Sequence, residues 1–401
     1  MNPTFADGMK EANRLTRAGR LAEATSLIQR LLGGGDARAP SAPPSGGPAA
    51  PGRAGPTIDA EYRVLDDRAP ESRATAPRDP EPAAAPPPPW GGLAETLRRL
   101  KGLGRQGRPA PVEAPPPEGA AFLAGTHAEA AGRRDYRLYV PARRPERPMP
   151  LLVMLHGCTQ TAADFAAGTR MNALAEEHGF LVLYPEQCPR ANAQRCWSWF
   201  NPADQRRDAG EPALLAGLVR EIARTHPVDR RRVYAAGLSA GGAAVAILAE
   251  TYPDMFAAVA IHSGLPPGSA RDMPSAFAAM RQGPTGASHG NGGPGGRHVP
   301  AIIFHGDRDA TVNPANGAAL AARFAAPGLP KAVRAGSPDG HTVTRTVQAG
   351  PDGATRMEHW VLHGAGHAWA GGSPEGSHTD PAGIDASREA VRFLLQHRLP
   401  G

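Results

Sequence analysis

One serine in this 401-residue chain is surrounded by residues that have almost no side chain. Ser239 lies in the sequence GLSAG (237–241), directly after the apolar run 233–236. A serine on a sharp turn between a strand and a helix needs glycine on both sides, because larger side chains would collide with the neighbouring elements. Backbone N–H groups at the start of such a helix point to where negative charge develops during acyl transfer. The pattern therefore predicts a nucleophilic serine.

A base and an acid are needed to activate this serine, because a hydroxyl is a poor nucleophile until its proton is removed. We expect the base to be His367, on a loop after an apolar segment, with His363 as the alternative. We expect the acid that orients it to be Asp309. Asp307 is the alternative acid, although an aspartate at this position commonly shapes a turn. The sequence thus predicts a Ser239–Asp309–His367 triad.

Two backbone N–H groups are expected to bind the oxyanion formed during the reaction. One belongs to Ala240, which follows the nucleophile. The other belongs to Cys158, on the loop after the apolar segment 151–155. His156 lies on the same loop and is predicted either to hold it by hydrogen bonds or to contact the substrate.

Short apolar segments alternate with helical patterns from residue 135 onward. Strands are expected at 135–140, 150–157, 180–186, 231–237, 256–264, 299–306 and 359–364, and helices at 169–177, 211–224, 241–250, 314–325 and 385–397. Apolar strands that alternate with helices favour a mostly parallel central sheet flanked by helices, an α/β class. The chain order Ser, Asp, His is the order of the α/β-hydrolase fold.

The N-terminal third differs from the rest in composition, because 19 of the 44 prolines lie between residues 40 and 117. Such a segment buries too little apolar surface to offset the entropy of ordering it. We predict a disordered linker at 35–118, with a short basic helix at 91–105. Residues 1–34 are predicted to form a helical hairpin arm that contacts a protein or a surface. The catalytic domain is expected at 119–401.

Composition excludes several classes of function. The formal net charge is +6, but no nucleic-acid-binding motif accompanies it, so no nucleic-acid partner is expected. No apolar run is long enough to span a membrane. No secretory signal is visible, which by sequence alone predicts a cytoplasmic location. We expect no metal and no other cofactor.

Several separate motifs resemble, in the same order, those of the poly(3-hydroxybutyrate) depolymerase family of esterases, which are related to feruloyl and acetylxylan esterases. These motifs are LHGCTQTAADFA, LYPEQ, RCWSWFNPADQRRDAGEP, GLSAGGA, YPDMFAAVAIHSGLP and HGDRDATVNP, within residues 121–398. The resemblance implies an α/β-hydrolase fold, an ester or polyester substrate and an acyl-enzyme on Ser239. It also implies a location in the extracellular region, which differs from the cytoplasmic location predicted from the lack of a visible secretory signal.

Further residues are candidates for the site. Trp197 and Trp199 could be walls of the site or ordinary core aromatics. The resemblance favours Trp197 as the one near the acyl group, and Trp369 could line the mouth. Cys158 and Cys196 fall within the family-like motifs, so their loops could approach each other. They could form a disulfide in an oxidising compartment and would be thiols in the cytosol.

Three functions remain open from the sequence. The first is a serine carboxylesterase acting on hydroxyalkanoate or similar short-acyl esters. The second uses the same triad to release ferulate or acetate from polysaccharide, or to cut peptides. The third is an interaction scaffold that binds a partner through the N-terminal arm. The complete triad favours an enzyme, because a scaffold has no need of it.

Overall fold

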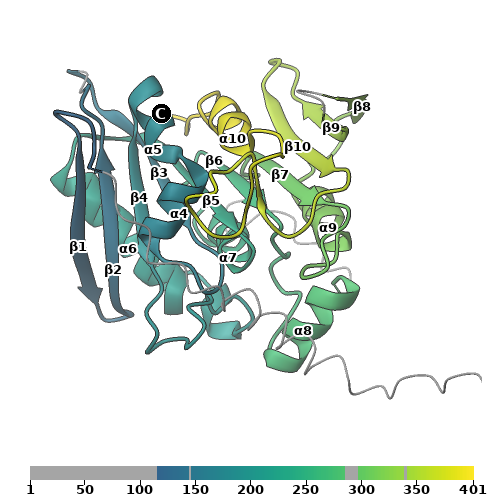
Figure 1. Ribbon diagram of the computed structural model, residues 1–401, viewed down its shortest axis with the longest axis horizontal. Coiled ribbons are helices and arrows are strands. Elements are labelled where there is room, and N and C mark those ends of the chain that lie inside the picture. Colours follow the sequence, from purple (N-terminus) through teal and green to yellow (C-terminus); the bar gives the residue numbers. More distant parts are fainter. Residues whose placement is uncertain (1–114, 144–145, 285–296, 338–340) are drawn as a thin grey trace, which may run out of the picture. The chain divides into compact units, whose positions relative to one another are not determined.

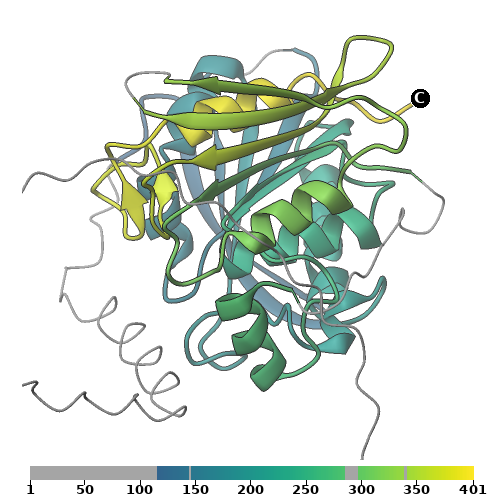
Figure 2. The ribbon, with the colours of Figure 1, turned by 90° about the vertical axis from the view of Figure 1, so that its right-hand side faces the viewer.

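A computed structural model describes residues 115–143, 146–284, 297–337 and 341–401 of the chain. The predicted hairpin arm (1–34), the basic helix (91–105) and nearly all of the predicted linker lie outside the described residues. The described part is built on one large sheet with a layer of helices on each face (Figures 1 and 2).

The sheet has ten strands. In chain order they are β1 (Ala121–Glu129), β2 (Gly132–Val140), β3 (Met149–Leu155), β4 (Leu181–Glu186), β5 (Val228–Leu238), β6 (Ala258–His262), β7 (Ala301–Gly306), β8 (Ala332–Gly336), β9 (Val343–Ala349) and β10 (Thr355–Leu362). Their order across the sheet is β1-β2-β4-β3-β5-β6-β7-β10-β9-β8. The central pairs from β4 to β10 are parallel, and the pairs at both edges are antiparallel. A separate two-stranded ladder joins β11 (Trp369–Ala370) to β12 (Thr379–Asp380).

Helices cover both faces of this sheet. One face packs against α4 (Ala162–Thr169), α5 (Met171–His178) and α10 (Ala386–Leu394). The other packs against α6 (Gly210–Thr225), α7 (Ala240–Thr251) and α9 (Ala315–Arg323), and α8 (Met273–Gln282) packs against α9. A short 3-10 helix, η1 (Pro202–Gln205), precedes α6.

Strand β3 shows why the central strands are continuous apolar runs. All seven of its residues are buried. Leu151, Val153 and Leu155 join the core on the α6–α7 face, whereas Leu152 and Met154 join the core on the α4–α5 face. Alternate side chains of a strand point to opposite faces, so a strand covered on both sides must be apolar throughout.

The predicted mostly parallel sheet with flanking helices is confirmed, but several of its elements differ from the prediction. Strands β1, β8 and β9 at the edges were not predicted, and all five residues of β8 are exposed. Helix α8 was not predicted either. The predicted helix 169–177 corresponds to α5, and the helix before it, α4, was not predicted. Arg170 separates the two helices because it adopts a left-handed conformation with φ of 54°.

Candidate active site

Ser239 is the single residue between the end of strand β5 and the start of helix α7. Its backbone has φ of 58° and ψ of −119°, a conformation that costs energy for any residue with a side chain. A Cβ on Gly237 would lie 2.5 Å from the carbonyl carbon of Gly241, and a Cβ on Gly241 would lie 2.1 Å from the carbonyl oxygen of Leu155. Both glycines are therefore required by the close approach of helix and strands, for the reason expected from the motif.

Asp309 and His367 form a buried pair. The two atoms that face each other, Asp309 Oδ2 and His367 Nδ1, are 2.7 Å apart. The other carboxylate oxygen accepts hydrogen bonds from the backbone N–H groups of Thr311 and Val312, at 2.9 and 2.8 Å. His305 Nε2 lies 3.4 Å from Asp309 Oδ2. Burial raises the pKa of Asp309, but the hydrogen bonds from His305 and His367 outweigh it and leave that pKa far below its usual value.

This pair fixes which nitrogen of His367 can act as a base. Because Asp309 is ionised, its oxygen only accepts, and the hydrogen between the two groups belongs to Nδ1 of His367. Nε2 then carries the lone pair that can take a proton. Ser239 and His367 line the same cavity, although no hydrogen bond joins them in the described part of the chain. Catalytic hydrogen bonds are often long without substrate and shorten when it binds.

The two alternative residues form a second pair instead of joining the first. Asp307 Oδ2 lies 2.8 Å from His363 Nδ1, and the other oxygen of Asp307 accepts from the backbone N–H of Gly364 at 2.7 Å. Both side chains are 38 % exposed, and neither lines the cavity that contains Ser239.

The loop after β3 presents the predicted oxyanion donor Cys158. Gln160 holds this loop, because its Oε1 accepts from the N–H of Gly157 at 2.9 Å. Among the described residues, none accepts a hydrogen bond from the N–H of Cys158. The N–H of Ala240 is the first of α7 and so has no acceptor within the helix. A disulfide joins Cys158 to Cys196 and ties the loop to the chain segment before η1.

A cavity of about 160 Å³ lies in front of Ser239. Its apolar wall is formed by Leu238, Trp199, Phe200, Met273, Ala276, Phe277 and Met280, and its polar wall by Thr159, Asn192, Gln194, Thr311, His367 and His378. Ligand sites are commonly apolar with a few convergent polar groups. This arrangement can hold an apolar acyl or alcohol group next to the serine hydroxyl.

The three predicted substrate-contact side chains, His156, Trp197 and Trp369, do not line this cavity. His156 and Trp197 are 0 % exposed and Trp369 is 1 % exposed. Trp197 Nε1 donates to the carbonyl oxygen of His156 at 3.0 Å, and Trp369 Nε1 donates to Ser387 Oγ at 2.9 Å. We therefore correct that prediction: these side chains are too deep to touch a substrate, and they hold the loops that carry the site.

His156 illustrates this supporting role. Its Nδ1 donates to the carbonyl oxygen of Gly157 at 2.8 Å, and its Nε2 accepts from the backbone N–H of Gln187 at 3.1 Å. Burial lowers its pKa, which keeps the ring neutral and suited to one donated and one accepted bond. The loop interpretation of His156 therefore agrees with its contacts.

From the sequence, the wrong one of two tryptophans was chosen, and several other residues around the cavity were missed. Trp199, the alternative to Trp197 as a wall of the site, lines the cavity in its place. Met273, Phe277 and Met280 recur at the spacing of one helix face, a signal that would have found α8. No local pattern marks His305, because its contact with Asp309 depends on the turn after β7.

Neither a metal site nor a membrane span is found in the portions of the chain described. No group of three or more His, Cys, Asp or Glu side chains there is arranged to hold a metal ion. No helix there combines the length and the apolar character needed to cross a bilayer.

Known proteins resemble this chain in both sequence and fold. The chain is 41% identical over 186 residues to poly(3-hydroxyalkanoate) depolymerase C of Paucimonas lemoignei, covering 44% of each chain. It is 35% identical over 128 residues to feruloyl esterase B of Neurospora crassa, covering 32% of this chain and 42% of that one. The chain thus spans less than half the length of these two relatives.

Among solved structures, an acetyl xylan esterase from Aspergillus awamori shares the fold, with a TM-score of 0.54 at 20% identity, over 68% of this chain and 99% of that one. The model of the family described as esterase PHB depolymerase matches residues 134–336, which include Ser239 and Asp309. Because that match covers half of the chain, the chain belongs to the esterase PHB depolymerase family.

Proposed function

We propose that this chain is a serine carboxylic-ester hydrolase that acts through an acyl-enzyme on Ser239. The observation that carries the proposal is that the strained Ser239 turn opens onto the same cavity as His367, whose other nitrogen is held by the buried Asp309. Family membership supports ester hydrolysis as the chemistry of this arrangement.

The reaction follows from the positions of these groups. His367 Nε2 takes the proton of Ser239 as the serine oxygen attacks the ester carbonyl carbon. The N–H groups of Cys158 and Ala240 bind the oxygen that becomes negative. The protonated His367 then gives its proton to the leaving alcohol as the ester bond breaks. In the second half, His367 activates a water molecule that releases the acid and restores the serine.

The substrate that we favour is a short-acyl ester of the 3-hydroxybutyrate type, as an oligomer or a loose polyester chain. A small cavity with an apolar wall fits a short acyl unit. Two relatives carry names that contain poly(3-hydroxyalkanoate) depolymerase and poly(3-hydroxybutyrate) depolymerase. We expect soluble oligomers and amorphous polyester to be cleaved in preference to crystalline granules.

The test compares Ser239→Ala with Ser263→Ala on p-nitrophenyl esters, 3-hydroxybutyrate oligomers and methyl ferulate. Ser263 is the matched control, since it is also a buried serine with positive φ (48°) after a strand, but it lies outside the cavity. Ser239→Ala should lose turnover of every substrate, whereas Ser263→Ala should keep it. Full turnover in Ser239→Ala would disprove the proposal.

A feruloyl or acetylxylan esterase is the second candidate. Trp199, Phe200 and Phe277 line the cavity and could stack on a feruloyl ring. Rapid release of ferulate, with no cleavage of 3-hydroxybutyrate oligomers, would select this candidate.

The domain boundaries also remain a proposal. We propose that residues 119–401 fold and hydrolyse small esters without the segment before them. Removal of residues 1–118 should leave a soluble active domain. Aggregation of the shortened chain, or loss of its activity on small esters, would show that the boundary is wrong.

A further inference from the structure

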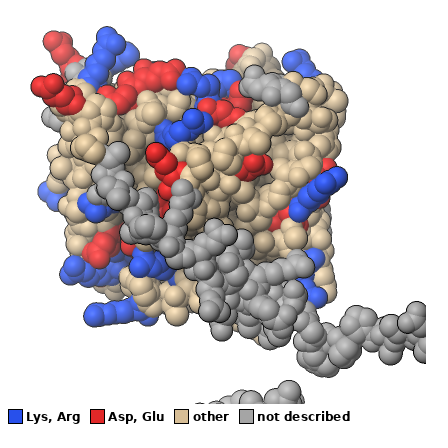
Figure 3. All heavy atoms as spheres, in the orientation of Figure 1, with Lys and Arg blue, Asp and Glu red and all other residues tan. Residues whose placement is uncertain are grey.

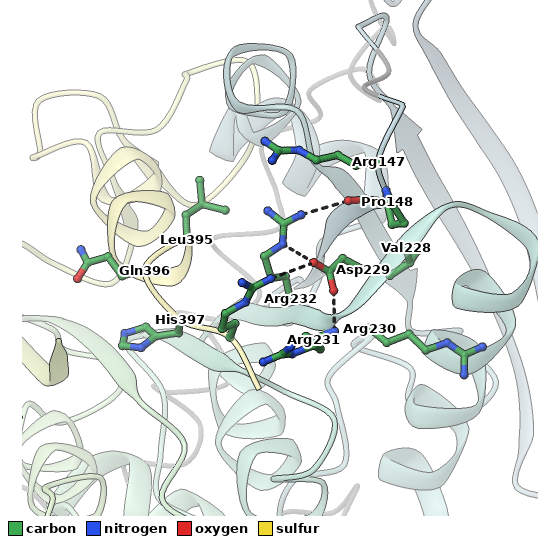
Figure 4. A pocket seen from close by; sticks show the side chains of 11 residues that line it. Arg147, Pro148, Val228, Asp229, Arg230, Arg231, Arg232, Leu395, Gln396 and His397 are labelled. Carbon is green, nitrogen blue, oxygen red and sulfur yellow. Dashed lines mark hydrogen bonds and ion pairs between the residues drawn. The ribbon is translucent and has the colours of Figure 1, made fainter. Parts of the chain in front are cut away.

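A second cavity, of about 680 Å³, lies at the end of strand β5 opposite to Ser239 (Figure 4). Ser239 follows the last residue of β5, whereas Val228, its first residue, lines this cavity together with 229–232, 147–148 and 395–398. A strand rises about 3.3 Å per residue, so the two sites are roughly 30 Å apart. The second cavity is therefore separate from the one in front of the serine.

Arginine dominates the lining of this second cavity. The five arginines are Arg147, Arg230, Arg231, Arg232 and Arg398, and the one carboxylate in the lining is Asp229. Asp229 Oδ2 accepts from Arg232 Nε at 2.7 Å and lies 3.8 Å from Arg398. Five positive charges against one negative charge leave four that no carboxylate of the lining compensates.

Both carboxylate oxygens of Asp229 accept hydrogen bonds from neighbouring arginines. Burial raises its pKa, but the hydrogen bonds from Arg232 and from the backbone N–H of Arg231 lower the pKa by more than burial raises it. The carboxylate is therefore ionised at neutral pH. It therefore cancels one charge and holds Arg232 in place.

Within the described part of the chain, two arginines of the cavity have side-chain nitrogen atoms that donate to no acceptor. Arg147 makes no hydrogen bond or ion pair with any described residue. Arg231 uses Nε to donate to the carbonyl oxygen of Leu399 at 2.8 Å, and its other side-chain nitrogens donate to none of the described residues. In Figure 4 the guanidinium groups of Arg147 and Arg232 lie on the same side, and that of Arg230 points away from them.

The excess of positive charge in this cavity contrasts with other parts of the surface. On the face seen in Figure 3, arginine and lysine side chains are interspersed with aspartate and glutamate. Arg388, for example, donates to both carboxylate oxygens of Glu177, at 2.9 and 3.0 Å. An excess of one charge in a hollow concentrates ions of the opposite sign there.

We propose that the arginine-lined cavity binds a linear oligophosphate anion. The guanidinium fork matches the oxygens of phosphate and binds them in pairs. The lining holds Pro148, Val228 and Leu395 as its apolar residues and no Phe, Tyr or Trp, so it offers no aromatic face for a nucleobase. A chain of phosphates without a base is therefore the anion that fits.

The test is a calorimetric titration of the full chain with inorganic tripolyphosphate. The variant Arg147→Gln/Arg398→Gln removes two of the five positive charges and leaves Asp229 paired with Arg232. Arg334→Gln is the matched control, because Arg334 is an exposed arginine on β8, at the edge of the sheet. Hydrolysis of p-nitrophenyl butyrate serves as the measure of correct folding in each protein.

We expect saturable binding by the parent chain and by Arg334→Gln, with affinity at least about tenfold weaker in the double variant, since each hydrogen bond between charged groups is worth about that factor. Binding should weaken from roughly 0.05 M to 0.5 M NaCl because salt screens exposed charges. Ester hydrolysis should be the same in all three proteins.

Equal affinity of the double variant and the parent chain would overturn the proposal, as would the absence of saturable binding at low salt. Two further ligands test the choice of anion. Oligoglutamate of the same charge that binds as tightly as tripolyphosphate would disprove recognition of phosphate. A thymidine oligonucleotide that binds more tightly would show that nucleic acid is the ligand.

Discussion

The two aspartate–histidine pairs lie at the carboxyl ends of two neighbouring parallel strands, and the paired atoms are nearly the same distance apart. Asp307 and Asp309 follow strand β7, while His363 and His367 follow its parallel neighbour β10. The distances between the paired oxygen and nitrogen atoms are 2.8 and 2.7 Å. A short distance between a carboxylate and an imidazole therefore does not by itself distinguish the pair that we propose to be catalytic from the other.

Burial and access to the cavity separate the two pairs. The side chain of Asp309 is 0 % exposed and that of His367 is 11 % exposed, whereas both members of the other pair are 38 % exposed. The second nitrogen of His363 lies 2.8 Å from Thr344 Oγ1. The ring of His363 is thus occupied on both sides, whereas His367 lines the cavity in front of Ser239.

The largest difference is expected when each histidine is removed in turn. His367→Ala should reduce kcat for p-nitrophenyl butyrate by about 10⁴-fold or more, because Ser239 loses its base. His363→Ala should leave kcat nearly unchanged. Steady-state kinetics of the two variants measures this directly, and a comparable loss in both would show that the pairs act together.

Substitution of the two aspartates should show the same contrast in kcat as substitution of the two histidines. Asp309→Asn should reduce kcat by about 10⁴-fold, because an amide leaves the imidazole in the wrong tautomer. Asp307→Asn should have a small effect, since its partner does not reach the cavity. If the loss of kcat instead follows Asp307→Asn, the assignment of the acid is wrong.

The sequence was informative where a short local pattern determines the structure. The glycines beside Ser239 predict the turn because each is in contact with the backbone of another element. The continuous apolar runs predict the central strands because both faces of the sheet are covered. The choice of Asp309 over Asp307 rested on the expectation that Asp307 shapes a turn and on the family resemblance, because both aspartates fit the chain order. The structure adds burial as a physical reason.

The sequence was uninformative where a position depends on distant contacts. Trp197 and Trp199 are two residues apart on the same segment, yet Trp197 is fully buried and Trp199 lines the cavity. Which of the two points outward depends on the packing of Trp197 against the β3 loop, where it donates to His156. Composition does not encode such a contact.

Acid stability should also separate the two aspartates. The pKa of each aspartate is lowered in the folded protein. At Asp309 burial raises the pKa, but the hydrogen bonds from His305 and His367 lower it by more. At Asp307 the hydrogen bond from His363 is the main cause. A lowered pKa stabilises the fold above the unfolded value of 3.8, and this contribution is lost as pH falls from there through the folded pKa. The loss should be larger for the buried Asp309 than for the exposed Asp307.

Urea unfolding at pH 6 and pH 3 tests this expectation. The difference in free energy of unfolding between the parent chain and Asp309→Asn should shrink from pH 6 to pH 3. The same difference for Asp307→Asn should be smaller at pH 6 and should change less. A difference for Asp309→Asn that grows on acidification would contradict the sign of the pKa shift.

The smallest effect is expected for the stability contributed by the exposed pair. His363 contacts Asp307 and Thr344, but its side chain is 38 % exposed, and solvent weakens such interactions. His363→Gln should therefore change the free energy of unfolding at neutral pH by less than about 1 kcal/mol. Glutamine keeps a polar side chain of similar reach, so the variant removes the imidazole without opening a cavity. Equilibrium urea unfolding measures the change, and a loss above about 2 kcal/mol would place the pair among the buried networks of the fold. That outcome would also explain why a second aspartate–histidine pair is placed beside the first, because its task would then be to fix the two loops that carry Asp309 and His367.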